Sequence, residues 1–165
     1  MCYSLTISFN RDFENLVRSL FSDKISLSDN KNAFFKETFG KDSLSFDLTD
    51  GYCSCPIYPL LLADNSEDEI EKIVQKYRRK GFSENKIKRV LSDKTNSQPK
   101  NPLNLREMLA EIVRESASLW IFVHQYEDTF AGEKLKSCET IELRIAELVN
   151  KKTEIPEDVI VKIKK

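Results

Sequence analysis

Two of the four cysteines in the chain, Cys53 and Cys55, lie two residues apart, and His124 is its single histidine. A cysteine thiolate held beside an imidazole base can act as a nucleophile. Such a pair also needs an oxyanion donor, such as the Gly51 amide, and a carboxylate that orients the imidazole ring. The candidate carboxylates are Asp47, Asp50 and Glu127. Because no local signature of a thiol enzyme family surrounds either cysteine, a thiol-dependent hydrolase or transferase is an alternative hypothesis for this chain.

The same residues, together with Cys138, supply the ligand types of a Cys3His zinc site. Structural zinc sites usually use paired ligands two to four residues apart, and only Cys53 and Cys55 are that close. Free cysteines also pack as small apolar side chains. The sequence contains no glycine-rich phosphate-binding motif and has four glycines in all. We therefore expect neither a metal ion nor another cofactor.

Residues 72–100 are strongly basic, with ten Lys or Arg residues against two acidic ones, Glu84 and Asp93. The residues expected to contact a partner are Arg78, Arg79, Lys80, Lys86 and Arg89. Such a segment could bind phosphates or an acidic protein surface. The overall pI of about 6.0 departs from the basic character of a dedicated nucleic-acid binder. We therefore expect an acidic protein partner, with nucleic acid as the alternative.

The first part of the chain predicts strands and one helix. Residues 2–9 alternate apolar and polar side chains, which is the pattern of a strand with one buried face, and residues 11–22 follow helical spacing. Residues 43–58 predict a β-hairpin, because Asp50 and Gly51 suit a two-residue turn. In this hairpin Leu48 faces Cys53, Phe46 faces Cys55 and Leu44 faces Ile57. Both cysteines then share the apolar face, which is either a small buried part of the core or a pair of thiols directed at a site.

The second part of the chain predicts mostly helices. Residues 66–94 read as two short helices joined at Gly81, and residues 104–116 form a third. Residues 118–126 are apolar on both faces, which is typical of a central strand. Residues 138–150 fit a helix, although Ile141, Leu143 and Ile145 also fit a strand. Val159, Val161 and Ile163 predict a final strand over residues 158–164.

These elements predict one α+β domain over residues 1–165, with a mostly antiparallel sheet covered by amphipathic helices. The basic helical hairpin, residues 66–94, projects from it as an insertion. No stretch approaches the roughly 18 apolar residues that span a bilayer, so we expect no membrane association. The N-terminus lacks the pattern of a signal peptide, which favours the cytoplasm, where thiols stay reduced.

The leading functional hypothesis is a non-enzymatic interaction module or small accessory subunit of a larger assembly. It would dock on its partner through the basic helical hairpin. The charge segregation favours this hypothesis, and so does the lack of an assembled catalytic motif. The thiol-dependent enzyme that uses Cys53 or Cys55 with His124 and the nucleic-acid-binding protein are the two alternatives.

Overall fold

The computed structural model describes residues 2–21, 25–61, 104–126 and 138–165. It also describes a few shorter stretches, which are 74–75, 78–79, 81–84, 86–87, 132 and 134–135. The chain divides into two compact units. The sheet unit comprises residues 1–62 and 104–165, and the inserted unit comprises residues 63–103. Most of the predicted helical hairpin, residues 66–94, lies outside the described residues.

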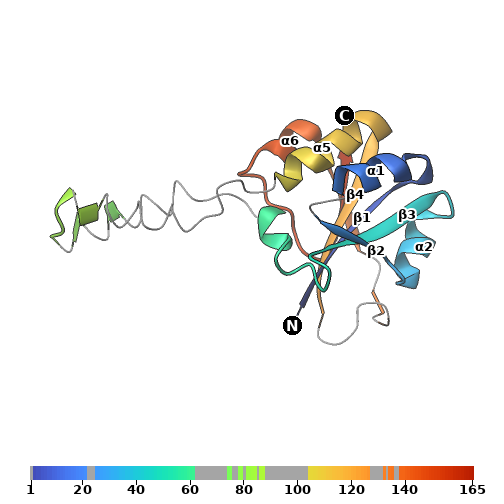
Figure 1. Cartoon of the computed structure of the whole chain (residues 1–165), viewed down its shortest axis with the longest axis horizontal. Helices are drawn as coiled ribbons and strands as arrows, with labels where there is room; N and C mark the ends of the chain where they lie inside the picture. The colour runs from blue at the N-terminus through green and yellow to red at the C-terminus, as the bar shows by residue number, and fades with distance from the viewer. Residues whose placement is uncertain are drawn as a thin grey trace. The chain divides into compact units, whose positions relative to one another are not determined.

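The sheet unit is built on one six-stranded open sheet with the strand order β2-β3-β1-β4-β6-β5 (Figure 1). The strands are β1 (Cys2–Asn10), β2 (Ser26–Asp29), β3 (Ser43–Thr49), β4 (Ser118–Tyr126), β5 (Glu139–Arg144) and β6 (Val159–Lys164). Four of the neighbouring pairs are antiparallel, and β5 with β6 is parallel. The prediction of a mixed α+β fold with a mostly antiparallel sheet is therefore confirmed.

The central strand β1 is buried on both of its faces. Leu5, Ile7 and Phe9 point to one face and are fully buried, because each has an exposed fraction of 0%. Ser4, Thr6 and Ser8 point to the other face, and they are also buried. The second face therefore needs internal hydrogen-bond partners for three hydroxyl groups. β4 is similarly placed between β1 and β6, as the apolar pattern of residues 118–126 predicts.

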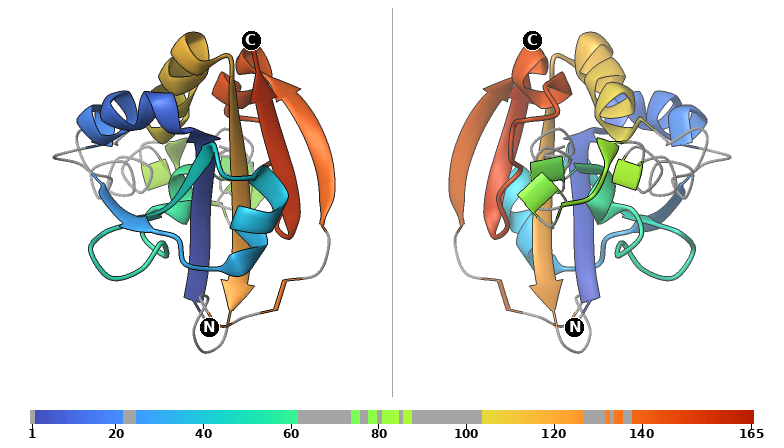
Figure 2. Two further views of the ribbon diagram at one scale, coloured as in Figure 1. Left: turned by 90° about the vertical axis from the view of Figure 1, so that its right-hand side faces the viewer. Right: turned by 90° about the vertical axis from the view of Figure 1, so that its left-hand side faces the viewer.

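The helices are α1 (Glu14–Phe21), which follows a 3-10 turn η1 (Arg11–Phe13), α2 (Ala33–Phe39), α5 (Leu105–Ser116) and α6 (Ile145–Val149). A second 3-10 turn, η2 (Tyr58–Leu61), precedes the inserted unit. α2 lies in front of β4 in the left view of Figure 2, and its Phe35 packs against Phe122 and Ile160. None of the described helices combines the length and the apolar character that crossing a membrane requires.

The predicted hairpin over residues 43–58 is wrong in its second half. β3 forms as expected, but it pairs with β1 and β2 rather than with the residues that follow it. Leu48 thus faces Leu27, and Phe46 faces Ile7. After Thr49 the chain forms a tight turn in which the Asp50 carboxylate accepts the Tyr52 and Cys53 amides, both at 3.1 Å. This side-chain turn competes with the two-residue hairpin turn and ends the strand.

The helix predicted over residues 138–150 is a strand followed by a short helix. β5 includes Ile141 and Leu143, as the alternative reading of this segment requires. The parallel pairing with β6 gives these two side chains neighbours on the same sheet. α6 then begins at Ile145, and the backbone amide of Arg144 donates to the Glu147 carboxylate at 2.7 Å. Pairing with β6 thus overrides the helical spacing of the local sequence.

Arg106, in the first turn of α5, is a buried arginine with an exposed fraction of 3%. Its guanidinium donates to four backbone carbonyl groups, and the donor–acceptor distances are 2.8 Å to Leu148, 3.1 Å to Asn150 and 2.7 Å to Thr153. The fourth acceptor is the carbonyl of Leu61. Burial lowers the pKa of Arg106. One side chain therefore joins the end of η2, α5 and the end of α6.

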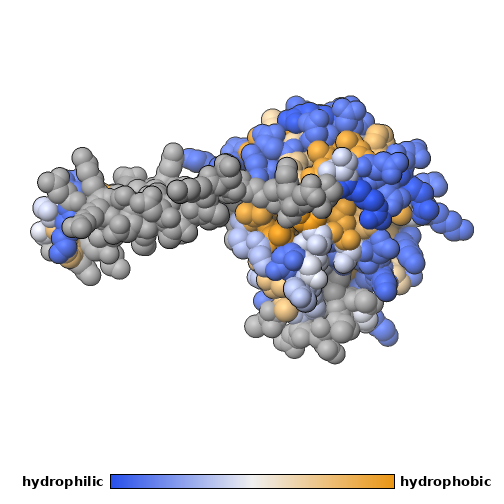
Figure 3. All heavy atoms as spheres, viewed as in Figure 1, coloured by the Kyte–Doolittle hydropathy of each residue, from blue (hydrophilic) through white to orange (hydrophobic). Residues whose placement is uncertain are grey.

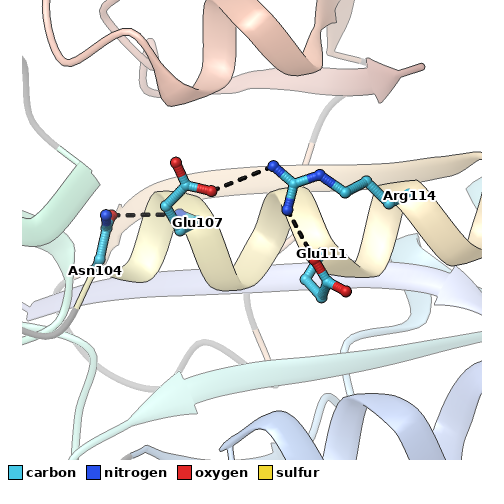
Figure 4. Close-up of polar contacts among 4 residues, drawn as sticks. All are labelled: Asn104, Glu107, Glu111 and Arg114. Carbon is cyan, nitrogen blue, oxygen red and sulfur yellow. Dashed lines mark hydrogen bonds and ion pairs between the residues drawn. The ribbon is translucent and has the colours of Figure 1, made fainter.

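α5 begins at an asparagine cap that Figure 4 shows in detail. The side-chain oxygen of Asn104 accepts the Glu107 amide at 3.3 Å, and Arg114 bridges Glu107 and Glu111 further along the helix. Replacing Asn104 with alanine leaves that amide without its protein acceptor. We expect the free energy of unfolding of N104A to fall by about 1 kcal/mol. Urea denaturation checks this, and N104D should restore most of the loss.

Candidate functional site

The strand β1 carries unusual backbone partners near its start. Residues 6–10 of β1 pair with β3, but β3 ends at Thr49, before it reaches the first residues of β1. On this edge the amide of Leu5 donates to Ser54 Oγ at 3.0 Å, and the amide of Tyr3 donates to Cys55 Sγ at 3.3 Å. A backbone amide in a sheet needs an acceptor, and here side chains of the loop after β3 supply it.

Three thiols meet at this edge. Cys2 is the first residue of β1 and precedes Tyr3, whose amide donates to Cys55 Sγ. The side chains of Cys2 and Cys53 both influence the pKa of the Cys55 thiol. All three are free cysteines of intermediate exposure. Tyr126 lies directly opposite Cys2 in the pairing of β1 with β4. We call Cys2, Cys53 and Cys55 the thiol cluster.

The hydrogen bonds of the thiol cluster act differently on its members. The Tyr3 amide has the largest influence on Cys55 and, with the Cys53 and Cys2 thiols, lowers the pKa of the Cys55 thiol despite some burial. The backbone amide of Cys55 lowers the pKa of Cys53, but the neighbouring thiol and burial together raise it above its ordinary value. Burial and the nearby thiols also raise the pKa of Tyr126. Within the Cys53–Cys55 pair, negative charge is therefore favoured on Cys55.

Behind this edge lies a polar network on the second face of the sheet. The Asp47 carboxylate accepts hydrogen bonds from Thr6 at 2.6 Å, from the Asn30 amide at 2.7 Å and from Ser4 at 3.2 Å. Burial raises the pKa of Asp47, and the three hydrogen bonds only partly offset that effect. Asn30 in turn accepts the Asn32 amide at 2.9 Å. The network satisfies the buried hydroxyl groups of Ser4 and Thr6 and leads to the N-terminus of α2.

His124 and the thiols have different partners in the described contacts. The Nδ1 atom of His124 lies 2.5 Å from a carboxylate oxygen of Asp158, and the ring stacks on Phe122. Burial and the charge of Asp158 raise the pKa of Cys138. The Gly51 amide, expected as an oxyanion donor, donates to Thr49 Oγ1 at 3.2 Å. The candidate carboxylate Asp50 forms the turn already described, and Glu127 lies outside the described residues.

Two residues, Cys2 of the thiol cluster and Asp158 beside His124, were not predicted from the sequence as candidate site residues. Cys2 was missed because its proximity to Cys55 depends on how the loop after β3 folds onto β1. Asp158 adopts a left-handed backbone conformation, with φ of 59°, just before β6. Aspartate is among the few residues that tolerate this conformation, but nothing local linked it to His124.

The four residues considered as zinc ligands, Cys53, Cys55, His124 and Cys138, all lie in the described part of the chain. In that part, no three His, Cys, Asp or Glu side chains are placed to hold a metal ion. The C-x-C pair contributes to the thiol cluster, whose third member comes from β1 rather than from His124 or Cys138.

The basic segment, defined as residues 72–100, belongs to the inserted unit. Its net charge is +8, so the rest of the chain carries a net charge of −9. Arg78, Arg79 and Lys86 are exposed, and Arg78 pairs with Glu84 at 2.7 Å. The ammonium group of Lys86 lies 4.3 Å from the centre of the Phe82 ring. Lys80 and Arg89 lie outside the described residues.

Comparison with known proteins does not extend these observations. No family model, curated protein or solved structure matches the chain. The functional argument therefore depends on the residues themselves, because a fold of this class hosts many unrelated activities.

Proposed function

We propose that the protein is a non-enzymatic interaction module, and that the basic segment docks on an acidic protein surface. The charge segregation carries this proposal. A net charge of +8 lies within 29 consecutive residues, while the rest of the chain carries −9. Complementary charges of this kind steer association and select the partner.

Exposure of the basic side chains supports the proposal. Arg78, Arg79 and Lys86 are exposed, so they can approach a partner without unfolding the segment. Glu84, one of the two acidic residues of the segment, pairs with Arg78. An exposed ion pair of this type contributes little to stability. The basic residues are therefore better explained by attraction of an acidic partner than by stabilisation of the inserted unit.

Nucleic acid is the alternative partner, and the charge on the rest of the chain disfavours it. A nucleic acid is an extended polyanion, and its length brings further phosphates toward the remainder of the protein, whose net charge is −9. An acidic protein patch can be confined to the area of the basic segment. Because the Debye length is about 8 Å at physiological salt, a confined patch would experience mainly the charges that lie close to it.

Charge reversal tests the proposal. The triple variant R78E, R79E and R89E should lose the partner, with an affinity at least ~10-fold weaker, because three attractive contacts become repulsive. The matched control is K31E, K36E and K41E, which reverses three exposed lysines of the sheet unit and gives the same net charge. Each protein would be purified gently from its native cells and examined by native mass spectrometry.

The wild type and the control should each carry a bound protein subunit that the charge-reversed variant lacks. The subunit would then be purified alone and its binding titrated against all three proteins. Equal binding to all three would contradict the proposal. So would a bound mass that nuclease removes, because the basic segment would then contact nucleic acid.

A further inference from the structure

The thiol cluster contains a cysteine whose sulfur is positioned by the backbone of the sheet. Cys55 Sγ accepts the Tyr3 amide at 3.3 Å, and the neighbouring Ser54 Oγ accepts the Leu5 amide at 3.0 Å. Two successive anchors on β1 therefore fix the loop that carries Cys55. Because β1 is the central strand, the position of this sulfur follows from the fold of the sheet rather than from a mobile surface loop.

The cluster remains accessible from solvent. Cys2, Cys53 and Cys55 are each partly exposed. Tyr52, next to Cys53, is 96% exposed and is the one large hydrophobic side chain that is exposed among the described residues. In the view of Figure 3, the described surface of the sheet unit is mainly hydrophilic around a central group of hydrophobic atoms. Because the three thiols are partly exposed, a small polar reagent can approach them.

We propose that Cys55 exchanges with low-molecular-weight disulfides, and that Cys2 then displaces the bound thiol to form a Cys2–Cys55 disulfide. This site is independent of the proposed docking through the basic segment. Three neighbouring thiols, one of which accepts a backbone amide hydrogen bond, carry the inference. The Tyr3 amide and the neighbouring thiols lower the pKa of Cys55, which increases its thiolate fraction near neutral pH.

The exchange proceeds in two balanced steps. The Cys55 thiolate attacks one sulfur of the disulfide RSSR, which forms Cys55–S–S–R and releases RS⁻. Cys2 then loses its proton to solvent and attacks Cys55 Sγ, which forms the Cys2–Cys55 bond and releases a second RS⁻. Both released thiolates take up protons from solvent. Two protein thiols are thereby oxidised by two electrons, and one RSSR is reduced to two RSH.

Cys2 is a better second thiol than Cys53. Cys53 and Cys55 are separated only by Ser54, whose side chain is held by the Leu5 amide. A bridge across one residue would have to distort that anchor to reach disulfide geometry. Cys2 comes from β1 and directly precedes Tyr3, whose amide lies 3.3 Å from Cys55 Sγ. Cys138 packs beside the buried Phe122 and Ile160 and serves as the internal comparison.

The first measurement is the rate of iodoacetamide labelling at pH 7, followed for each cysteine by peptide mass spectrometry. Cys55 should react at least ~10-fold faster than Cys138, because reactivity follows the thiolate fraction and exposure. Equal rates at the two positions would overturn the proposal. Trypsin cleaves after Arg11, Lys41 and Lys136, which places Cys2, Cys138 and the Cys53–Cys55 pair on three peptides. Fragmentation of the third peptide assigns the label to Cys53 or Cys55.

The second measurement uses glutathione disulfide as the probe. The wild type and C138S should each lose two hydrogen atoms and yield a cross-link between the peptides of Cys2 and Cys55. C2S should stop with one glutathione attached to Cys55, and both C55S and C55A should react at least ~10-fold more slowly. Attached glutathione that persists equally in the wild type and C2S would show that Cys2 does not displace it, and would overturn the proposal.

Discussion

Replacing Arg106 with methionine is expected to lower the free energy of unfolding by about 3 kcal/mol. The substitution keeps much of the aliphatic volume but removes all the donors of the guanidinium. Four carbonyl groups then lose their common partner, among them those of Leu148 and Thr153. Each unsatisfied buried acceptor costs about 1–3 kcal/mol. Relief from burying the arginine charge offsets part of the sum.

Guanidinium chloride denaturation followed by circular dichroism measures this effect. R114M is the matched control, because Arg114 lies on the same helix but is exposed and pairs with Glu107 and Glu111. R106K should recover little of the loss, since one ammonium group cannot reproduce the planar arrangement that reaches four carbonyls. If R106M and R114M had the same denaturation midpoint, the structural role assigned to Arg106 would be wrong.

Substitution of Asp47 is expected to have the second large effect on stability. Two substitutions separate its role as a hydrogen-bond acceptor from the effect of its charge. D47A removes the common acceptor of Ser4, Thr6 and Asn30, and we expect it to destabilise the protein by about 2 kcal/mol. D47N keeps one acceptor oxygen and removes the charge. Because burial raises the pKa of Asp47, the ionised form is disfavoured in the folded state. D47N should therefore be at least as stable as the wild type at pH 7.

The same pKa shift predicts the direction of a pH dependence. The folded-state pKa of Asp47 lies above its ordinary value of 3.8, so folding takes up a proton between these two values. The free energy of unfolding of the wild type therefore falls as the pH rises through this interval, and this contribution is constant above it. Urea denaturation of the wild type and D47N from pH 4 to pH 7 measures the difference. A stability difference that does not change with pH would contradict the assignment.

The sequence predicted the central strands well because their patterns extend over many residues. Residues 118–126 are apolar on both faces and form β4 with those bounds, and residues 2–9 form all but the last residue of β1. A long periodic pattern indicates which side chains are buried, so a strand can be predicted from it without knowing which strands are its neighbours. The helix over residues 104–116 was predicted for the same reason, since its apolar side chains recur at helical spacing.

The loop after β3 was not predicted because its conformation depends on distant residues. Asp50 and Gly51 suit a hairpin turn, but the Asp50 carboxylate accepts two amides of a different turn. β1 and β2 already occupy both edges of β3, so no returning strand can pair with it. Strand order is a property of the whole sheet and leaves no local signal in residues 43–58.

The composition of the candidate site also depends on residues that are distant in the sequence. The C-x-C spacing marked Cys53 and Cys55, but the third thiol, Cys2, is 53 residues away from Cys55 in the sequence. The proposed partner His124 was chosen because it is the only histidine, and it contacts Asp158 in the structure. Residue type can identify the groups that could react, whereas their neighbours depend on tertiary contacts.

The hydrogen bond between Arg106 and the Leu61 carbonyl joins the last described residues before the inserted unit to the first helix after it. The entry and exit of the insertion are thus fastened together from within the sheet unit. This contact holds the two ends of the inserted chain close together and does not depend on the sequence of the insertion. Interactions within the sheet unit therefore offset the conformational entropy lost in closing the loop. Evolution could lengthen, shorten or exchange the insertion at this position while the sheet unit keeps its own fold.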